Sequence, residues 1–163
     1  MNKIYKHIWQ FLDIYLFLLI IIFSFLFAIQ IDYLELKNYV TLNENGYSLV
    51  DIFYNNLQVY LLIILGILTL GISSILILFI NFFNIFVHLF TESIQSSLFH
   101  AVNYIIRYAG IEILGFFMAF SITILFLKSL YKKNFSKFKD EVMIRLILGI
   151  ILLIIAAFIE VNC

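Results

Sequence analysis

The stretch LQVYLLIILGILTLGISSILILFINFFNIFVHLF, residues 57–90, decides the fold because it contains no Asp, Glu, Lys or Arg. As one helix it would extend about 50 Å, at a rise of about 1.5 Å per residue. The hydrocarbon core of a membrane is only about 30 Å thick, so a single span cannot use the whole stretch. We therefore expect a helical hairpin over 57–90. Its bend should fall within 70–76, near Gly71, Ser73 and Ser74, where small residues tolerate irregular backbone.

Apolar segments before and after this hairpin predict three further spans. The first is too long for the apolar part of a signal peptide, and no small-x-small cleavage site follows it, so it is read as an uncleaved helix. The predicted fold is an all-α, polytopic transmembrane helix bundle of about five spans. It forms one membrane domain over 1–163, with span 8–31, outer loop 32–56, hairpin 57–90, span 104–127, basic cytoplasmic loop 128–141 and span 142–162.

The distribution of lysines predicts the orientation in the membrane. Lys3 and Lys6 precede the first span, five lysines lie within 128–141, and the loop 32–56 is net acidic. Lysines and arginines in short loops remain on the cytoplasmic side. This rule places the N-terminus inside and the C-terminus outside, and it requires two spans within 57–90.

The composition excludes several classes of protein. Hydrophobic residues make up 64% of the chain and charged residues 12%, which a water-soluble surface does not accommodate. The net charge is zero, so a nucleic-acid partner has no electrostatic support. Cys163 is the only cysteine, which excludes an internal disulfide and disfavours a thiolate metal site. No phosphate-binding glycine loop, H-E-x-x-H or G-x-S-x-G motif occurs, so we expect neither a cofactor nor enzymatic activity.

Two carboxyl groups lie inside apolar segments, at Glu112 and Glu160. A charge inside a span is costly, about 2.5 to 3.5 kcal/mol at mid-membrane, so such residues are functional candidates. Glu112 shares a helix face with Gly115, and Glu160 shares one with Gly149 and Ala156, so both are expected to face the bundle. If its span begins at 104, Glu112 lies about 12 Å deep as a neutral, hydrogen-bonded acid. We expect function to depend on Glu112, although a purely structural role is the alternative.

The topology places other polar residues at the same outer end. The predicted polar cluster contains Glu112, Glu160, Arg107, Tyr108, His88, Asn55, Asn56 and Asn81. Arg107 is expected to pair with Glu160, unless both side chains extend separately to the headgroups. Tyr108 is placed to donate to Glu112, and Asn81 to bond across helices. The histidines lack zinc-ligand spacing and are read as interfacial.

Four short segments resemble the stage II sporulation protein M family. Residues 55–62 (NNLQVYLL) resemble the segment with which an apolar stretch begins in that family. Residues 78–83 (LFINFF) resemble its Phe-x-Asn-Gly-Phe element, with Phe82 in place of glycine. Residues 107–113 (RYAGIEI) resemble its Pro-His-Gly-x-x-Glu-[Leu/Ile] motif, where Glu112 matches. Residues 156–161 (AAFIEV) resemble its closing Ala-x-x-Ile-Glu motif, where Glu160 matches.

The resemblance implies a five-span bacterial cell-membrane protein without enzymatic activity. Founding members of the family help to localise cell-wall hydrolytic machinery during spore engulfment. Short relatives occur beside circular-bacteriocin genes and serve maturation, export or self-protection. The expected partners are therefore the lipid bilayer and another membrane protein, such as an ABC transporter or a cell-wall hydrolase complex. A peptide or a second copy of the chain is an alternative partner.

Overall fold

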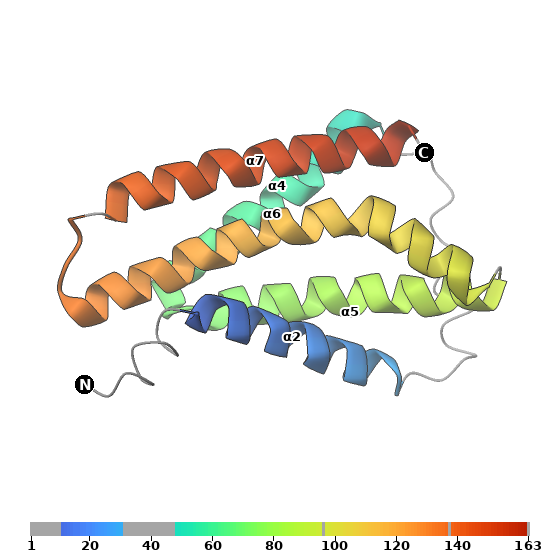
Figure 1. Ribbon diagram of the computed structural model, residues 1–163, viewed down its shortest axis with the longest axis horizontal. Coiled ribbons are helices and arrows are strands. Elements are labelled where there is room, and N and C mark those ends of the chain that lie inside the picture. Colours follow the sequence, from blue (N-terminus) through green and yellow to red (C-terminus); the bar gives the residue numbers. More distant parts are fainter. Residues whose placement is uncertain (1–10, 31–47, 96, 137, 163) are drawn as a thin grey trace.

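The computed structural model describes residues 11–30, 48–95, 97–136 and 138–162, and the regular structure of these residues is entirely helical. The elements are α2 (Leu12–Ala28), α4 (Leu49–Leu65), the short 3-10 helix η1 (Gly66–Thr69), α5 (Ile72–Gln95), α6 (Leu98–Lys132) and α7 (Phe138–Asn162) (Figure 1). The predicted all-α fold is thus confirmed. Most of the predicted loop 32–56 and parts of the predicted span 8–31 lie outside the described residues.

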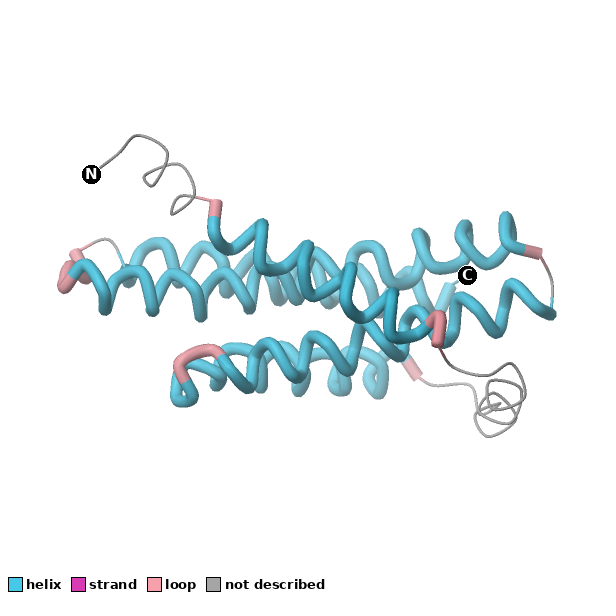
Figure 2. Tube along the Cα trace, turned by 90° about the horizontal axis from the view of Figure 1, so that it is seen from below, coloured by secondary structure: helices cyan, strands magenta, loops and turns pink. Residues whose placement is uncertain are grey.

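Successive helices run in opposite directions along one axis (Figures 1 and 2). The start of α2, the bend between α4 and α5, and the loop between α6 and α7 lie at one end. This end is named the basic end, because Lys128, Lys132, Lys133 and Lys139 belong to it. The end of α2, the start of α4, the α5–α6 connection and the end of α7 lie at the opposite end. It is named the carboxyl end after the side chains of Glu112 and Glu160. This alternation is the arrangement that a chain of five passes requires.

Four helical stretches are long and apolar enough to cross a membrane, namely Leu49–Thr69, Ile72–Ile94, Ala109–Lys132 and Phe138–Asn162. The described part of α2 is a shorter apolar helix. The predicted membrane bundle is therefore confirmed as an architecture. Its element boundaries, however, differ from the predicted ones in three places.

The second span begins earlier than predicted, at Leu49 within the predicted loop 32–56. A capping box explains this start. The Ser48 hydroxyl accepts a hydrogen bond from the Asp51 N–H at 3.2 Å, and the Asp51 carboxylate accepts one from the Ser48 N–H at 3.2 Å. Because these side chains satisfy N–H groups of the first turn, the polar residues that follow belong to the helix.

The fourth predicted span, 104–127, is part of a longer helix. α6 contains 35 residues and is about 52 Å long. The Ser97 hydroxyl caps its start by accepting from a backbone N–H of the first turn, and Lys133 ends it in the left-handed conformation. Residues 128–132 of the predicted basic loop are therefore helical. α7 begins at Phe138, so only the short connection between the two helices is loop.

The hairpin bend begins earlier than the predicted range 70–76. It consists of η1 followed by Leu70 and Gly71, both at positive φ. Gly66 lies so close to Ser74 that a Cβ would overlap it, which explains why a glycine follows the last residue of α4. Gly71 has a φ of 89°, a conformation that favours glycine.

Side-chain hydroxyl groups satisfy the backbone around the bend. The buried Ser74 hydroxyl donates to the Ile63 carbonyl at 2.6 Å, and the Thr123 hydroxyl of α6 donates to the same carbonyl at 3.0 Å. Thr69 donates to the Gly66 carbonyl at 3.1 Å. An irregular backbone within a membrane needs such partners, because lipid supplies no hydrogen bonds.

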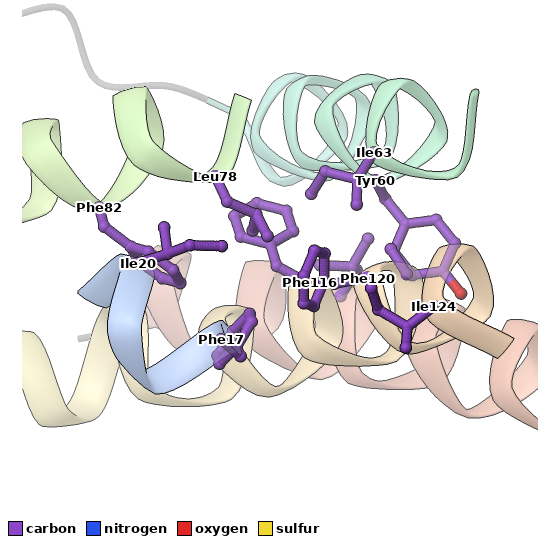
Figure 3. Packing of buried hydrophobic residues seen from close by; sticks show 11 residues of the cluster. Phe17, Ile20, Tyr60, Ile63, Leu78, Phe82, Phe116, Phe120 and Ile124 are labelled. Atoms are coloured by element: carbon purple, nitrogen blue, oxygen red, sulfur yellow. The ribbon is translucent and has the colours of Figure 1, made fainter. Parts of the chain in front are cut away.

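An aromatic core joins α2, α4, α5 and α6 near the middle of the molecule (Figure 3). The residues labelled there are Phe17, Ile20, Tyr60, Ile63, Leu78, Phe82, Phe116, Phe120 and Ile124. The Phe17 ring meets Phe82 and Phe117 edge to face, at centroid distances of 5.2 and 5.0 Å. These contacts attach the first helix to the rest of the bundle.

The α4–α5 bend does not reach as far as the α6–α7 loop (Figure 2). Gly71 lies against the side chains of Thr123 and Leu127. α6 continues from Leu127 to Lys132, which is about 8 Å further. At the basic end, the last turns of α6 therefore extend further along the bundle axis than the α4–α5 bend, and Lys132 lies beyond the bend.

Candidate functional site

The closest packing around the predicted carboxyl groups is between α6 and α7, the most extensive helix pair in the described molecule. Gly115 of α6 lies against the Leu153 side chain, and Gly149 of α7 lies against the Tyr60 ring. A Cβ at either glycine would overlap its neighbour. Ala156 is also buried, so the small-residue faces predicted from the sequence are contact faces between helices.

Glu112 lies three residues before Gly115, and Glu160 lies four residues after Ala156. Both side chains are partly buried, and the two carboxyl groups are close enough to interact electrostatically. Neither carboxyl group has a hydrogen bond or an ion pair with any residue that the structure describes. The fold thus brings together the two acids that the sequence singles out, but it does not supply the predicted hydrogen bond to Glu112.

Asn56 of α4 adds a buried amide at a similar depth. It is 6% exposed and lies one turn before Tyr60, on the face that packs against α7. α4 and α6 run parallel, with their register set by the bond between the Ile63 carbonyl and Thr123. Counting back from this bond places Asn56 and Glu112 about 6 Å apart along the bundle axis. The Asn56 amide makes no hydrogen bond to the described residues.

The predicted ion pair between Arg107 and Glu160 is absent. Arg107 is exposed and belongs to neither of the two ion pairs found among the described residues. It lies five residues before Glu112, about 140° further round the helix, and therefore on a different face. The matching depth of Arg107 and Glu160 stays a prediction, but the ion pair inferred from it is wrong.

Other members of the predicted cluster are not brought to the carboxyl pair. His88 and Asn55 are exposed on α5 and α4. Asn81 donates to the Ile77 carbonyl of its own helix at 2.8 Å, so the predicted bond across helices is wrong. A short amide side chain reaches the carbonyl one turn earlier more easily than a neighbouring helix. The side chain of Tyr108 is outside the described part, and its donation to Glu112 remains a prediction.

The depth of Glu112, predicted as about 12 Å for a span that begins at 104, stays a prediction. α6 itself begins at Leu98, so about 21 Å of helix precedes Glu112. The first turns of α6 carry Asn103 and Arg107, which are exposed and suit water or headgroups. A partner can therefore reach the carboxyl pair from the carboxyl end.

Two ionic contacts near the basic end were not predicted from the sequence. The Lys128 ammonium group lies 3.3 Å from the Asp13 carboxylate and joins α6 to α2. The Arg145 guanidinium group donates to the Ser121 carbonyl at 2.9 Å and lies 3.5 Å from the Glu141 carboxylate. Both contacts have a signal in the sequence, because Asp13 and Arg145 are isolated charges in apolar segments that the topology directs to this end.

The chemistry available at the carboxyl pair is that of hydrogen-bond acceptors. Two carboxyl groups and one amide can bind an ammonium or guanidinium group, or several N–H and O–H donors. Within the described ranges, no group of three or more His, Cys, Asp or Glu residues could hold a metal ion. The arrangement therefore suits recognition of a polar or cationic group from a partner.

The apolar helices, their alternation and the polar contacts between them define a multi-pass integral membrane protein. The family model of Stage II sporulation protein M matches residues 14–163, nearly the whole chain, and the chain therefore belongs to this family. The resemblance inferred from the four motifs is thus confirmed. No curated protein and no solved structure matches the chain.

Proposed function

We propose that this protein, without catalytic activity of its own, is a scaffold or accessory subunit that binds another membrane protein at its carboxyl end. The proposed setting is a bacterial cell membrane with the carboxyl end outside. The proposed partner is a cell-wall hydrolase complex or an ABC transporter. The observation that carries the proposal is the pairing of Glu112 and Glu160, partly buried and without hydrogen bonds to the described residues.

Two partly buried carboxyl groups without hydrogen-bond donors are costly for the fold. Carboxyl groups that are removed from water need hydrogen-bond donors, and two carboxylates side by side repel each other. A partner helix or loop that inserts an ammonium, guanidinium or hydroxyl group relieves both costs. One polar contact between helices in a membrane contributes about 0.6 to 2 kcal/mol. Several such contacts, together with apolar packing, are sufficient for a stable complex.

The test of the site is Glu112→Gln in a strain that lacks the wild-type gene. Glutamine has nearly the same shape but cannot bind a cation as a carboxylate does. We expect a normal level of the variant in the membrane together with loss of complementation. Glu141→Gln, at the basic end, is the matched control and should complement. Full complementation by Glu112→Gln would refute the functional role, and loss of the protein from the membrane would indicate a structural one.

The partner is identified by photo-cross-linking in cells. Photoreactive residues at Val161 and Asn162, both exposed beside Glu160, should capture the partner. The same residue at Met143 or Ile144, exposed near the basic end, is the control. Adducts of equal yield at both ends would contradict a partner site at the carboxyl end. An adduct of twice the mass of the chain would identify a second copy as the partner.

A role in maturation, export or immunity for a circular bacteriocin is the second candidate. It is favoured by the exposed Asn103 and Arg107 on the turns of α6 that precede Glu112, which a peptide can contact from the carboxyl end. In that case the deletion strain becomes sensitive to the peptide or ceases to secrete it. Unchanged sensitivity and secretion in the deletion strain would exclude this role and leave the scaffold proposal.

A further inference from the structure

We propose that the α4–α5 bend and the basic end of α6 form a binding site for one anionic phospholipid. The acyl chains would lie against the exposed leucines of the bend. The phosphate would bind Lys132 and Lys133, which follow the bend along the bundle axis. The site lies at the opposite end from the carboxyl pair and does not depend on the proposed partner.

The bend presents an apolar surface. Leu68 is 80% exposed and Leu70 is 64% exposed. No Asp, Glu, Lys or Arg occurs from residue 52 to residue 91, so the whole hairpin lacks charges that would draw its tip into water. On α6, the face that meets Gly71 through Leu127 continues one turn later as Leu130, which is also exposed. The exposed leucines of the bend and of the end of α6 are together named the apolar ledge: Leu68, Leu70 and Leu130. Lys133 ends α6 three residues after Leu130, about one turn further along the helix.

The spacing of the ledge and the lysines matches a phospholipid. Leu127 is level with the bend, and Lys132 is about 8 Å further along α6. The headgroup layer adds about 5 to 7 Å to each side of the hydrocarbon core. If the bend ends at the edge of the hydrocarbon, Lys132 and Lys133 are therefore at the depth of lipid phosphates.

The lysines are held on an ordered turn. The Lys133 and Asn134 N–H groups donate to carbonyls of the last turn of α6, at 3.2 and 3.1 Å. The Phe135 ring packs against Phe126 and Phe138, at centroid distances of 6.2 and 5.7 Å. A fixed turn loses little conformational entropy when a ligand binds.

The charge at the turn favours an anion. Lys132 and Lys133 are exposed and form no ion pair with the described residues, whereas Lys128 is bound to Asp13. The acidic groups that follow on α7 are Asp140, which is exposed, and Glu141, which is paired with Arg145. A basic cluster directly beside a membrane span attracts anionic lipids in preference to zwitterionic ones.

The test uses the purified full chain in detergent with phosphatidylglycerol, phosphatidylcholine or inorganic phosphate added. Bound lipid is counted by native mass spectrometry, and stability is followed by thermal unfolding. Phosphatidylglycerol should be retained and should raise the unfolding temperature more than phosphatidylcholine does. Lys132→Gln and Lys133→Gln should each weaken its binding about fivefold, the factor for one lysine near an anionic surface.

Lys139→Gln is the matched control, because it removes the same charge from an exposed site on α7. It should retain the lipid. The proposal would be overturned if the protein bound the two lipids equally, or if both α6 variants bound phosphatidylglycerol as well as the wild type does. It would also be overturned if Lys139→Gln lost as much binding as the α6 variants. If inorganic phosphate alone produced the full stabilisation, the site would bind a free anion and the lipid proposal would be wrong.

Discussion

At the scale of single residues, glycines decide how closely the helices approach. Gly149 accommodates the Tyr60 ring, whose hydroxyl then donates to the Arg145 carbonyl of α7 at 3.3 Å. Among the residues that the structure describes, Gly110 has no heavy atom of another element within 4 Å of the position of a Cβ. Two glycines that look alike in the sequence therefore have different roles, because only one of them faces a neighbouring ring.

This difference predicts opposite effects of alanine. Gly149→Ala should destabilise the protein by about 1 to 3 kcal/mol, because the added methyl group displaces the Tyr60 ring. Gly110→Ala should be neutral or stabilise it by up to about 1 kcal/mol, because alanine favours helix. Thermal unfolding of both variants in the same detergent measures the two effects. A similar loss of stability in both would show that Gly149 is not the contact described.

At the scale of elements, the α4–α5 hairpin depends on one carbonyl with two donors. The Ile63 carbonyl accepts from Ser74 of the following helix and from Thr123 of α6. The bond from Thr123 also fixes the register of α4 and α6, and with it the position of Asn56. The bend therefore positions residues that lie far from it.

The paired donors predict non-additive mutations. Ser74→Ala or Thr123→Val alone should cost about 1 kcal/mol, because the other hydroxyl still reaches the carbonyl. The double variant should cost more than the sum, because the carbonyl loses both partners in a site without water. Ser93→Ala, which removes a hydroxyl bonded within its own helix, is the control. If the loss of stability in the double variant equalled the sum of the two single losses, the two hydroxyl groups would not share the Ile63 carbonyl as acceptor.

The attachment of α2 rests partly on the ion pair between Asp13 and Lys128. Their side chains are 14% and 15% exposed, so removing one charge leaves the other poorly solvated. Asp13→Asn should cost on the order of 2 kcal/mol. Glu141→Gln, in a more exposed pair, should cost about 1 kcal/mol or less. The double variant Asp13→Lys with Lys128→Asp, which exchanges the two charges, should recover part of the lost stability. If it did not, the ion pair would not be the cause of the loss.

At the scale of the whole molecule, the two ends carry different chemistry. The basic end has the lysines of α6 and α7, and the carboxyl end has Glu112 and Glu160. The start of α2 and the α6–α7 loop lie at the same end, as the lysine distribution predicts. This agreement supports a five-span orientation in which the basic end is cytoplasmic.

Cysteine labelling tests this orientation. In a Cys163→Ser background, Asn162→Cys should react with a membrane-impermeant maleimide in intact cells. Ser136→Cys, in the α6–α7 loop, should react only after the cells are permeabilised. Both positions are exposed, so a difference between them reports the side of the membrane and not burial. Reaction of Ser136→Cys in intact cells would overturn the orientation.

The sequence by itself determined the class of fold, the family and the identity of the two acids. Uncharged runs longer than one membrane thickness, the clusters of lysine and the small residues at helical spacing carry that information locally. The tertiary structure alone decided the boundaries and the partners. The Ser48 cap extends α4, and Asp13 pairs with Lys128. Arg107 forms no ion pair with Glu160, and Asn81 bonds within its own helix. Periodicity gives the depth and face of a residue within its own helix, but contacts between helices depend on their relative rotation and offset, which packing determines.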